Sequence, residues 1–194
     1  MNNANTKSMH RVNYKSIRNK VITDAEKLII KNVNKKIQNL LKNNELKGYL
    51  GIYWPLNNEV DLRGLKENYN IPIALPAITK EGLLTYRPWT ESPLENDFHG
   101  IPAPLNEPIL EAKELSLLLV PAIAIDLKGY RLGYGGGFFD RLRSTKNWSS
   151  VPALVVLPKA CIVRKPLPRD SWDIPFNGWI NEDGEFQPNN EANI

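Results

Sequence analysis

The sequence has almost no cysteine, which limits the kinds of protein and of chemistry that it can encode. Cys161 is the only cysteine among the 194 residues, so no internal disulfide can form, and a reducing compartment is expected. Its neighbours are apolar, and we therefore expect a buried structural thiol rather than a nucleophile. No Ser–His or Cys–His arrangement indicates covalent catalysis.

Long apolar runs and dense basic blocks are missing as well. No segment reaches the length of a membrane span, and the N-terminal residues lack the apolar core of a signal peptide. The formal net charge is +4, and Lys and Arg are spread along the chain without a recognisable nucleic-acid-binding module. We therefore expect a cytoplasmic protein that acts on an anionic small molecule and binds neither membranes nor nucleic acid.

No repeat or linker divides the chain, so we expect one domain over residues 1–194, with flexible ends at residues 1–6 and about 185–194. Apolar runs bounded by proline and glycine predict strands, and these alternate with helical patterns. Such alternation favours an α/β fold with a largely parallel central sheet. The expected strands are at 48–54, 71–76, 83–89, 117–120 and 151–157, with an edge strand at 178–181.

Two helices are expected before the first strand. A short one lies near residues 7–18, and the capping box from Thr23 to Glu26 predicts a second one that ends at about Asn43. A further short helix is expected to begin at Glu59. The second helix should bury one apolar stripe, formed by Leu28, Ile29, Val33, Ile37, Leu40 and Leu41.

The most informative stretch runs from Leu117 to Arg143. An apolar strand is followed by a turn at Asp126 and Gly129, then by a loop with four glycines between 133 and 137, and then by a helix start. Because glycine has no Cβ, the backbone N–H groups of such a loop can approach a phosphate closely. The loop therefore predicts an anion site beyond the carboxyl end of its strand.

Two charged residues flank this loop. Arg131 can make forked hydrogen bonds to phosphate oxygens, and Asp140 can hold Mg²⁺ against the same phosphates. The alternative is that the glycines only form a tight turn and that Asp140 only complements the helix dipole. The loop lacks both the Gly-Lys-Ser/Thr ending of nucleoside triphosphatases and the third glycine of the dinucleotide fingerprint, where Phe138 stands.

The segment D-x-x-G-Y-R-L-G-Y-G-G-G-F-F-D, from Asp126 to Asp140, resembles the signature of the 5-formyltetrahydrofolate cyclo-ligase family. The resemblance extends from about Lys7 to Glu182. It implies a single three-layer α/β domain, as in sugar-phosphate isomerases and coenzyme A transferases. It also implies Mg²⁺-dependent and ATP-dependent ring closure of 5-formyltetrahydrofolate to 5,10-methenyltetrahydrofolate, with ADP and phosphate released. We expect a monomer.

The resemblance also implies roles for residues far from the loop. Lys7 and Arg11 match a Lys-x-x-x-Arg pair of the ATP site, although a solvated basic helix face is the alternative. Trp54 and Glu59 match the border of the folate pocket, and Glu59 could accept hydrogen bonds from the pterin, although a helix-terminal acid is the alternative. Asp173 matches a second metal contact, but Trp172 and Asn177 depart from the family pattern. We assign His99 no role.

The resemblance therefore implies four groups of site residues. Arg131 and Asp140 are the expected catalytic residues, and Asp140 and Asp173 the expected ligands of Mg²⁺. The expected ATP site comprises Lys7, Arg11, Arg131, Leu132, Gly133, Tyr134, Gly135, Gly136, Gly137, Phe138 and Phe139. The expected folate site comprises Trp54, Glu59, Tyr134, Gly135, Gly136, Gly137 and Phe138.

In the implied reaction the γ-phosphoryl group of ATP passes to the formyl oxygen, N10 attacks the formyl carbon, and phosphate departs. Such a transfer asks the protein mainly for positioning and charge neutralisation. Two alternatives stay open: a sugar-phosphate isomerase on the same fold, and a non-catalytic relative that binds folate, a nucleotide or nucleic acid. An isomerase would need its own acid–base carboxylates and no ATP.

Overall fold

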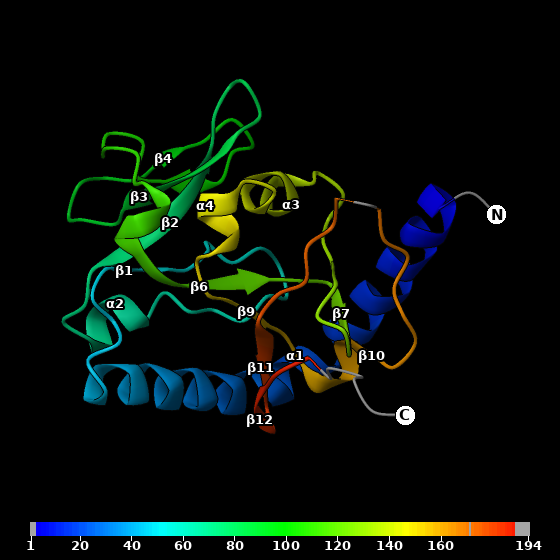
Figure 1. The fold of residues 1–194 in the computed structure, drawn as a ribbon. Helices are drawn as coiled ribbons and strands as arrows, with labels where there is room; N and C mark the ends of the chain where they lie inside the picture. Colours follow the sequence, from blue (N-terminus) through cyan, green and yellow to red (C-terminus); the bar gives the residue numbers. More distant parts are fainter. Residues whose placement is uncertain (1–2, 171, 189–194) are drawn as a thin grey trace.

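The computed structural model describes residues 3–170 and 172–188. A seven-stranded sheet in the order β12-β11-β9-β6-β1-β2-β3 forms the centre of the domain (Figure 1). The strands from β2 to β11 are parallel, and β3 and β12 join the two ends antiparallel. The strands are β1 (Tyr49–Gly51), β2 (Ile73–Ile78), β3 (Leu84–Pro88), β6 (Leu115–Pro121), β9 (Ala153–Val156), β11 (Gly178–Asn181) and β12 (Gly184–Phe186).

Both faces of this sheet are covered. In β6, Leu117 and Leu119 belong to one buried cluster, whereas Leu118 and Val120 belong to another on the opposite face. The first cluster packs under α1 (Asn3–Lys42) and α2 (Leu65–Asn68), and the second under α3 (Phe138–Arg143) and α4 (Lys146–Ser149). Burying each such leucine stabilises the fold by about 1.5–3 kcal/mol. The expected three-layer α/β architecture is confirmed.

Helix α1 is one continuous helix of 40 residues, not the two helices expected. The segment contains neither proline nor glycine, so nothing in it stops a helix. Thr23 lies inside α1 and begins no helix, and the side chain of Glu26 instead accepts a hydrogen bond from the backbone N–H of Asp61 at 2.8 Å. Asn3–Thr6, expected to be flexible, belong to the first turns of α1, while residues 1 and 2 lie outside the described residues.

The buried stripe of α1 is narrower than expected. Ile29, Val33 and Ile37 are fully buried at i, i+4 and i+8, but Leu28 and Leu41 are 48% and 41% exposed. Leu28 is one position, about 100° of helix rotation, away from the buried line, whereas Leu41 continues the i+4 spacing but lies in the last turn of α1, where the line ends. The prediction was therefore wrong for Leu28 and Leu41.

Two smaller sheets complete the described chain. One contains β7 (Ala124–Asp126), β8 (Arg131–Leu132) and β10 (Ile162–Val163), and the other pairs β4 (Glu95–Asn96) with β5 (Pro102–Ala103). The turn expected at Asp126 and Gly129 is the β7–β8 hairpin, where Gly129 has φ +85° and a Cβ would meet the Phe176 carbonyl oxygen at 2.7 Å. The glycine-rich loop therefore follows the short strand β8 and not β6. Short 3₁₀ helices η1 and η2 span Ala112–Glu114 and Lys159–Cys161.

The C-terminal part of the described chain differs from the prediction in one strand. β12 follows β11 through a tight turn and pairs with it antiparallel, so β11 is not the edge of the sheet. Residues 184–186 are thus ordered in a strand, and the remainder of the expected flexible end at 189–194 lies outside the described residues.

Cys161 is fully buried, and burial raises the pKa of its thiol to about 12. The thiol therefore stays protonated near neutral pH and is a poor nucleophile, as a structural cysteine would be. Among the described helices, none combines the length and the apolar character that crossing a bilayer requires.

The connections that follow the neighbouring parallel strands β1 and β6 lead to opposite faces of the sheet. β1 leads to α2 on one face of the sheet, whereas β6 leads through the β7–β8 hairpin to α3 and α4 on the other face. A crevice opens at the carboxyl ends of two strands whose connections diverge in this way, and open α/β sheets bind their ligands there.

Candidate functional site

The glycine-rich loop, Gly133–Gly137, connects β8 to α3 at this crevice. Gly135 and Gly137 have φ values of +110° and +64°, in the region that favours glycine, so side chains here would strain the loop. A Cβ on Gly135 would also lie 3.5 Å from the guanidinium carbon of Arg11. α3 has only six residues, so the charge at this site comes mainly from surrounding side chains.

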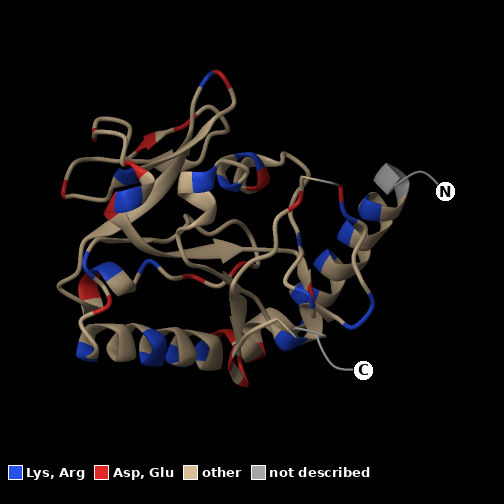
Figure 2. Ribbon diagram, in the orientation of Figure 1, with Lys and Arg blue, Asp and Glu red and all other residues tan. Residues whose placement is uncertain are grey.

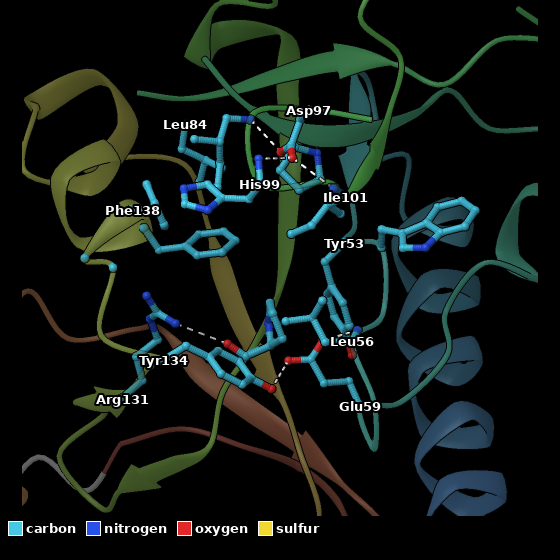
Figure 3. A pocket seen from close by; sticks show the side chains of 18 residues that line it. Tyr53, Leu56, Glu59, Leu84, Asp97, His99, Ile101, Arg131, Tyr134 and Phe138 are labelled. Atoms are coloured by element: carbon cyan, nitrogen blue, oxygen red, sulfur yellow. Dashed lines mark hydrogen bonds between the residues drawn. The ribbon is translucent and has the colours of Figure 1, made fainter. Parts of the chain in front are cut away.

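Two cavities meet at this loop, and Gly133, Gly136, Gly137 and Arg131 line both of them. The first, of about 360 Å³, we call the apolar cavity; it is also lined by Tyr53, Trp54, Leu56, Glu59, Pro76, Ile78, Leu84, Asp97, His99, Ile101, Pro121, Tyr134, Phe138 and Phe139 (Figure 3). The second, of about 490 Å³, we call the charged cavity; it is also lined by Lys7, Arg11, Leu132, Gly135, Asp140, Arg141, Ser144, Asp170, Trp172 and Asp173.

Arg131 lies where the two cavities meet. Its guanidinium is 3.5 Å from both carboxylate oxygens of Asp140 and donates to the Pro121 carbonyl at 3.2 Å. The rings of Phe139 and Phe176 lie 4.9 and 5.5 Å from the guanidinium carbon, and the side chain is only 6% exposed. The contact with Asp140 is long for a salt bridge, so the guanidinium keeps donors for an anion in either cavity.

Lys7 and Arg11 project from α1 into the charged cavity. Lys7 donates to Asp170 at 2.7 Å and to Asp173 at 3.1 Å, and Arg11 donates through Nε to the Gly133 carbonyl at 2.9 Å. Partial burial lowers the pKa of Lys7, but the hydrogen bonds with the two aspartates outweigh it and leave the pKa raised. The alternative of a freely solvated basic face is therefore wrong for this pair.

The two expected metal ligands, Asp140 and Asp173, both line the charged cavity. Asp173 also accepts a hydrogen bond from the backbone N–H of Asp170 at 2.8 Å. Within residues 3–170 and 172–188, no three potential metal-ligating side chains form a cluster. This donor set fits Mg²⁺, which commonly uses one or two carboxylates together with phosphate oxygens. Asn177 instead accepts from the Ala153 N–H at 2.8 Å, which gives it a structural role.

Glu59 is buried on the wall of the apolar cavity. One of its carboxylate oxygens accepts a hydrogen bond from the Tyr134 hydroxyl, and the other accepts one from the Leu56 N–H at 2.8 Å (Figure 3). α2 begins only at Leu65, so the alternative of a helix-terminal acid is wrong for Glu59. Burial, together with the negative charge of Glu59, raises the pKa of Tyr134, which keeps the phenol protonated and able to donate.

Arg18 completes this network and was not predicted. It is only 3% exposed, and its guanidinium lies 3.7 Å from the Glu59 carboxylate and 3.3 and 3.4 Å from the carbonyl oxygens of Ala122 and Asn57. The available signal was its position seven residues after Arg11, which places both on one face of an uninterrupted helix. Both residues lie within the helix expected near residues 7–18, but Arg18 belongs to no motif that marks a site.

The opposite wall of the apolar cavity comes from the segment 97–101, shown at the top of Figure 3, and it was also missed. Asp97 is buried and accepts hydrogen bonds from the backbone N–H groups of Ile78, His99 and Ile101 at 2.8–3.0 Å. These bonds hold His99 against the ring of Phe138, at 5.2 Å between centroids. The sequence offered two signals, the length of the loop between the expected strands at 83–89 and 117–120 and the resemblance of residues 100–104 to a Gly-Ile-x-x-Pro segment of the family. Neither singled out Asp97.

Every residue that the sequence suggested for the site lines one of the two cavities, but the division between them differs. Tyr134 and Phe138 were expected at both ligands and Phe139 at ATP, but of the two cavities these three line only the apolar one. Gly135 was expected at both ligands and lines only the charged cavity. Trp54 lines the apolar cavity, with its ring against that of Trp89 at 6.1 Å. The roles of all these residues stay predictions.

We expect Glu59→Gln to weaken binding of a pterin ligand at least about tenfold, because an amide in place of the carboxylate loses one charge-assisted acceptor. The same change should leave nucleotide affinity within about twofold, since Glu59 lines only the apolar cavity. Calorimetric titration with 5-formyltetrahydrofolate and, separately, with ATP measures both. Equal weakening of the two ligands would contradict a pterin contact.

The comparison with protein families and curated relatives gives one family. A model described as the 5-formyltetrahydrofolate cyclo-ligase family matches residues 3–181. The 5-formyltetrahydrofolate cyclo-ligase of Haemophilus influenzae is 34% identical over 148 residues, covering 71% of this chain and 77% of that protein. The protein of the same name from Escherichia coli is 38% identical over 69 residues, covering 35% of this chain and 37% of that protein.

Two solved structures share the fold. The NMR structure of 5,10-methenyltetrahydrofolate synthetase from Aquifex aeolicus has a TM-score of 0.75 at 24% identity and covers 97% of this chain and 95% of that one. The synthetase of the same name from Mycoplasma pneumoniae has a TM-score of 0.67 at 19% identity and covers 91% and 98%. Because the family model spans most of the chain and a relative is 34% identical, the chain belongs to the 5-formyltetrahydrofolate cyclo-ligase family.

Proposed function

We propose that this protein closes 5-formyltetrahydrofolate to 5,10-methenyltetrahydrofolate in an ATP-dependent and Mg²⁺-dependent reaction that releases ADP and phosphate. Family membership and the identity with the Haemophilus influenzae cyclo-ligase support the activity. The observation that carries the rest is the meeting of an apolar cavity and a charged cavity at one glycine-rich loop, with Arg131 lining both.

The apolar cavity suits the folate. Its walls supply rings and aliphatic groups for a flat heterocycle, and the buried carboxylate of Glu59 can accept hydrogen bonds from the pterin's N–H donors. Because the Tyr134 hydroxyl and Arg18 both approach Glu59, the carboxylate is held in one orientation before the ligand arrives. We place the formyl group towards Arg131 and the loop.

The charged cavity suits the triphosphate. The loop can offer backbone N–H groups, and Lys7, Arg11 and Arg131 can neutralise phosphate oxygens. A formyl oxygen on one side of the loop and a γ-phosphoryl group on the other could then meet at Arg131, which would stabilise the charge of the transfer. Attack of N10 on the activated formyl carbon needs no side-chain nucleophile.

Asp140 and Asp173 would hold Mg²⁺, which when bound neutralises phosphate charge. Our expectations of a single-domain, monomeric and cytoplasmic protein that binds neither nucleic acid nor membranes remain predictions. The expectation that the chain is neither a sugar-phosphate isomerase nor a non-catalytic relative is also a prediction. Turnover of a sugar phosphate without ATP would identify an isomerase.

The proposal is tested by mixing the protein with 5-formyltetrahydrofolate, Mg²⁺ and ATP and following methenyl absorbance. We expect one ADP released for each methenyl group formed, and no product when ATP is omitted. Tight binding of both ligands without product would favour a non-catalytic relative instead.

We expect Asp140→Asn to reduce turnover about tenfold at saturating ATP and low Mg²⁺, because an amide binds a hard cation more weakly than a carboxylate. Raising the Mg²⁺ concentration should restore part of the loss. The fold should persist, since Asp140 is partly exposed and only loosely paired with Arg131. Turnover as a function of Mg²⁺, with thermal unfolding as a control, measures this; an unchanged Mg²⁺ profile would return Asp140 to a helix-terminal role.

A further inference from the structure

A third cavity, of about 510 Å³, adjoins the apolar cavity on the side of α1. Trp54, Leu56, Ile101 and Tyr134 line both, so the two cavities are adjacent. The third cavity does not share a residue with the charged cavity. It therefore extends the proposed folate site away from the nucleotide.

The lining of this cavity is more polar than that of the apolar cavity. Besides the four shared residues it has two basic residues, Lys15 and Arg18, and amide groups, from Asn19, Asn57 and Asn58. Amides and ammonium groups are the donors that a carboxylate ligand needs. Figure 2 shows that Lys and Arg recur along the whole length of α1, which forms one side of this opening.

Of the two basic residues that line the third cavity, Lys15 is the one without a salt-bridge partner in the described chain. Arg18 is paired with the carboxylate of Glu59, whereas within the described chain no carboxylate lies within salt-bridge distance of Lys15. Its ammonium lies 5.0 Å from the centre of the Tyr134 ring, and the hydroxyl of the same tyrosine donates a hydrogen bond to Glu59. Tyr134 thus separates the expected position of the pterin from an exposed cation.

We propose that the third cavity binds the γ-glutamyl tail of the folate substrate and that Lys15 selects for its carboxylates. This inference rests on the proposed function. A folate carries its glutamate at the end opposite the pterin, and each added γ-glutamyl residue adds one carboxylate. With the pterin at Glu59 and the reacting atoms at the loop, the third cavity is the continuation of the apolar cavity that offers positive charge and amide donors.

The test compares three substrates that differ only in the tail: 5-formyltetrahydropteroate, which has no glutamate, and the monoglutamyl and triglutamyl forms of 5-formyltetrahydrofolate. We expect Lys15→Glu to raise the KM for the triglutamyl form about tenfold and for the monoglutamyl form about threefold, because the change turns attraction into repulsion. The KM for the pteroate and kcat for all three should stay unchanged. High salt should erase the difference between wild type and variant.

Lys20→Glu is the matched control, since Lys20 is exposed on the same helix and lines none of these cavities. It makes the same charge change and should leave all three KM values within about twofold. Equal shifts for all three substrates, no shift in Lys15→Glu, or the same shifts in the control would overturn the subsite while the activity stands. Absence of turnover by the wild type with all three would overturn the proposed function and the subsite with it.

Discussion

Arg131→Met should lower kcat about 10³-fold, the loss that removal of a guanidinium from a phosphoryl-transfer site commonly produces. Arg131 lines both cavities, and its low exposure means that any charge it neutralises is poorly screened by water. Methionine keeps much of the side-chain volume between the rings of Phe139 and Phe176. The loss should therefore fall on turnover more than on the free energy of unfolding.

Two companion variants make the result interpretable. Arg131→Lys retains the charge without the fork and should recover only part of kcat, because one ammonium cannot contact two ligands in the geometry of a guanidinium. Arg164→Met removes an exposed arginine that lines neither cavity and should leave kcat within about twofold. Initial rates of methenyl formation at saturating substrates, with thermal unfolding in parallel, give the comparison. A kcat for Arg131→Met within tenfold of wild type would exclude Arg131 from the transfer step.

The centre of the site was readable from the sequence because its signals are local. Glycines at positive φ, an arginine before them and an aspartate after them lie within ten positions, so chain connectivity alone keeps Arg131 and Asp140 near the loop. The apolar strand 117–120 was equally local. Its residues alternate between two buried clusters, which only a sheet covered on both faces allows.

The distant contributions were not readable from local patterns. No local pattern around Lys7 predicts its hydrogen bond to Asp170 at 2.7 Å. Lys7 and Arg11 were assigned to the site only because they resemble a family pattern. Arg18 and Asp97 carried no such pattern. Each is buried and bonded to groups brought near by the tertiary fold, so only the packed structure reveals them.

The largest error in the expected secondary structure is the division of α1 into two helices. A strong local capping signal at Thr23 predicted two helices, but the tertiary packing of Ile22, Ile29 and Val33 on the sheet favours one. As a single helix, α1 carries Arg11 to the glycine-rich loop and Arg18 to Glu59. One helix thus positions one charged group in the charged cavity and another against Glu59, which lines the apolar cavity.

The largest effect expected from α1 is that of Arg11→Ala on the nucleotide. Arg11 already donates through Nε to the Gly133 carbonyl, and its guanidinium lies beside Gly135 and lines the charged cavity. Truncating a partly buried charge that pairs with a phosphate costs about 2–5 kcal/mol, whereas an exposed surface charge costs about 0–1 kcal/mol. We therefore expect the KM for ATP to rise about a hundredfold, with the KM for the folate nearly unchanged.

Deletion of residues 1–11 removes both Arg11 and the ion pairs of Lys7, so it should weaken ATP at least as much as Arg11→Ala does. Its thermal stability without ligand should change little, because Arg18 is the first buried residue among residues 6–42 of α1. Ser16→Ala, at an exposed position of the same helix, is the control for helix propensity alone. Unchanged ATP kinetics in Arg11→Ala would contradict a contact with the nucleotide. The arginine would then only stabilise the glycine-rich loop through its hydrogen bond to the Gly133 carbonyl.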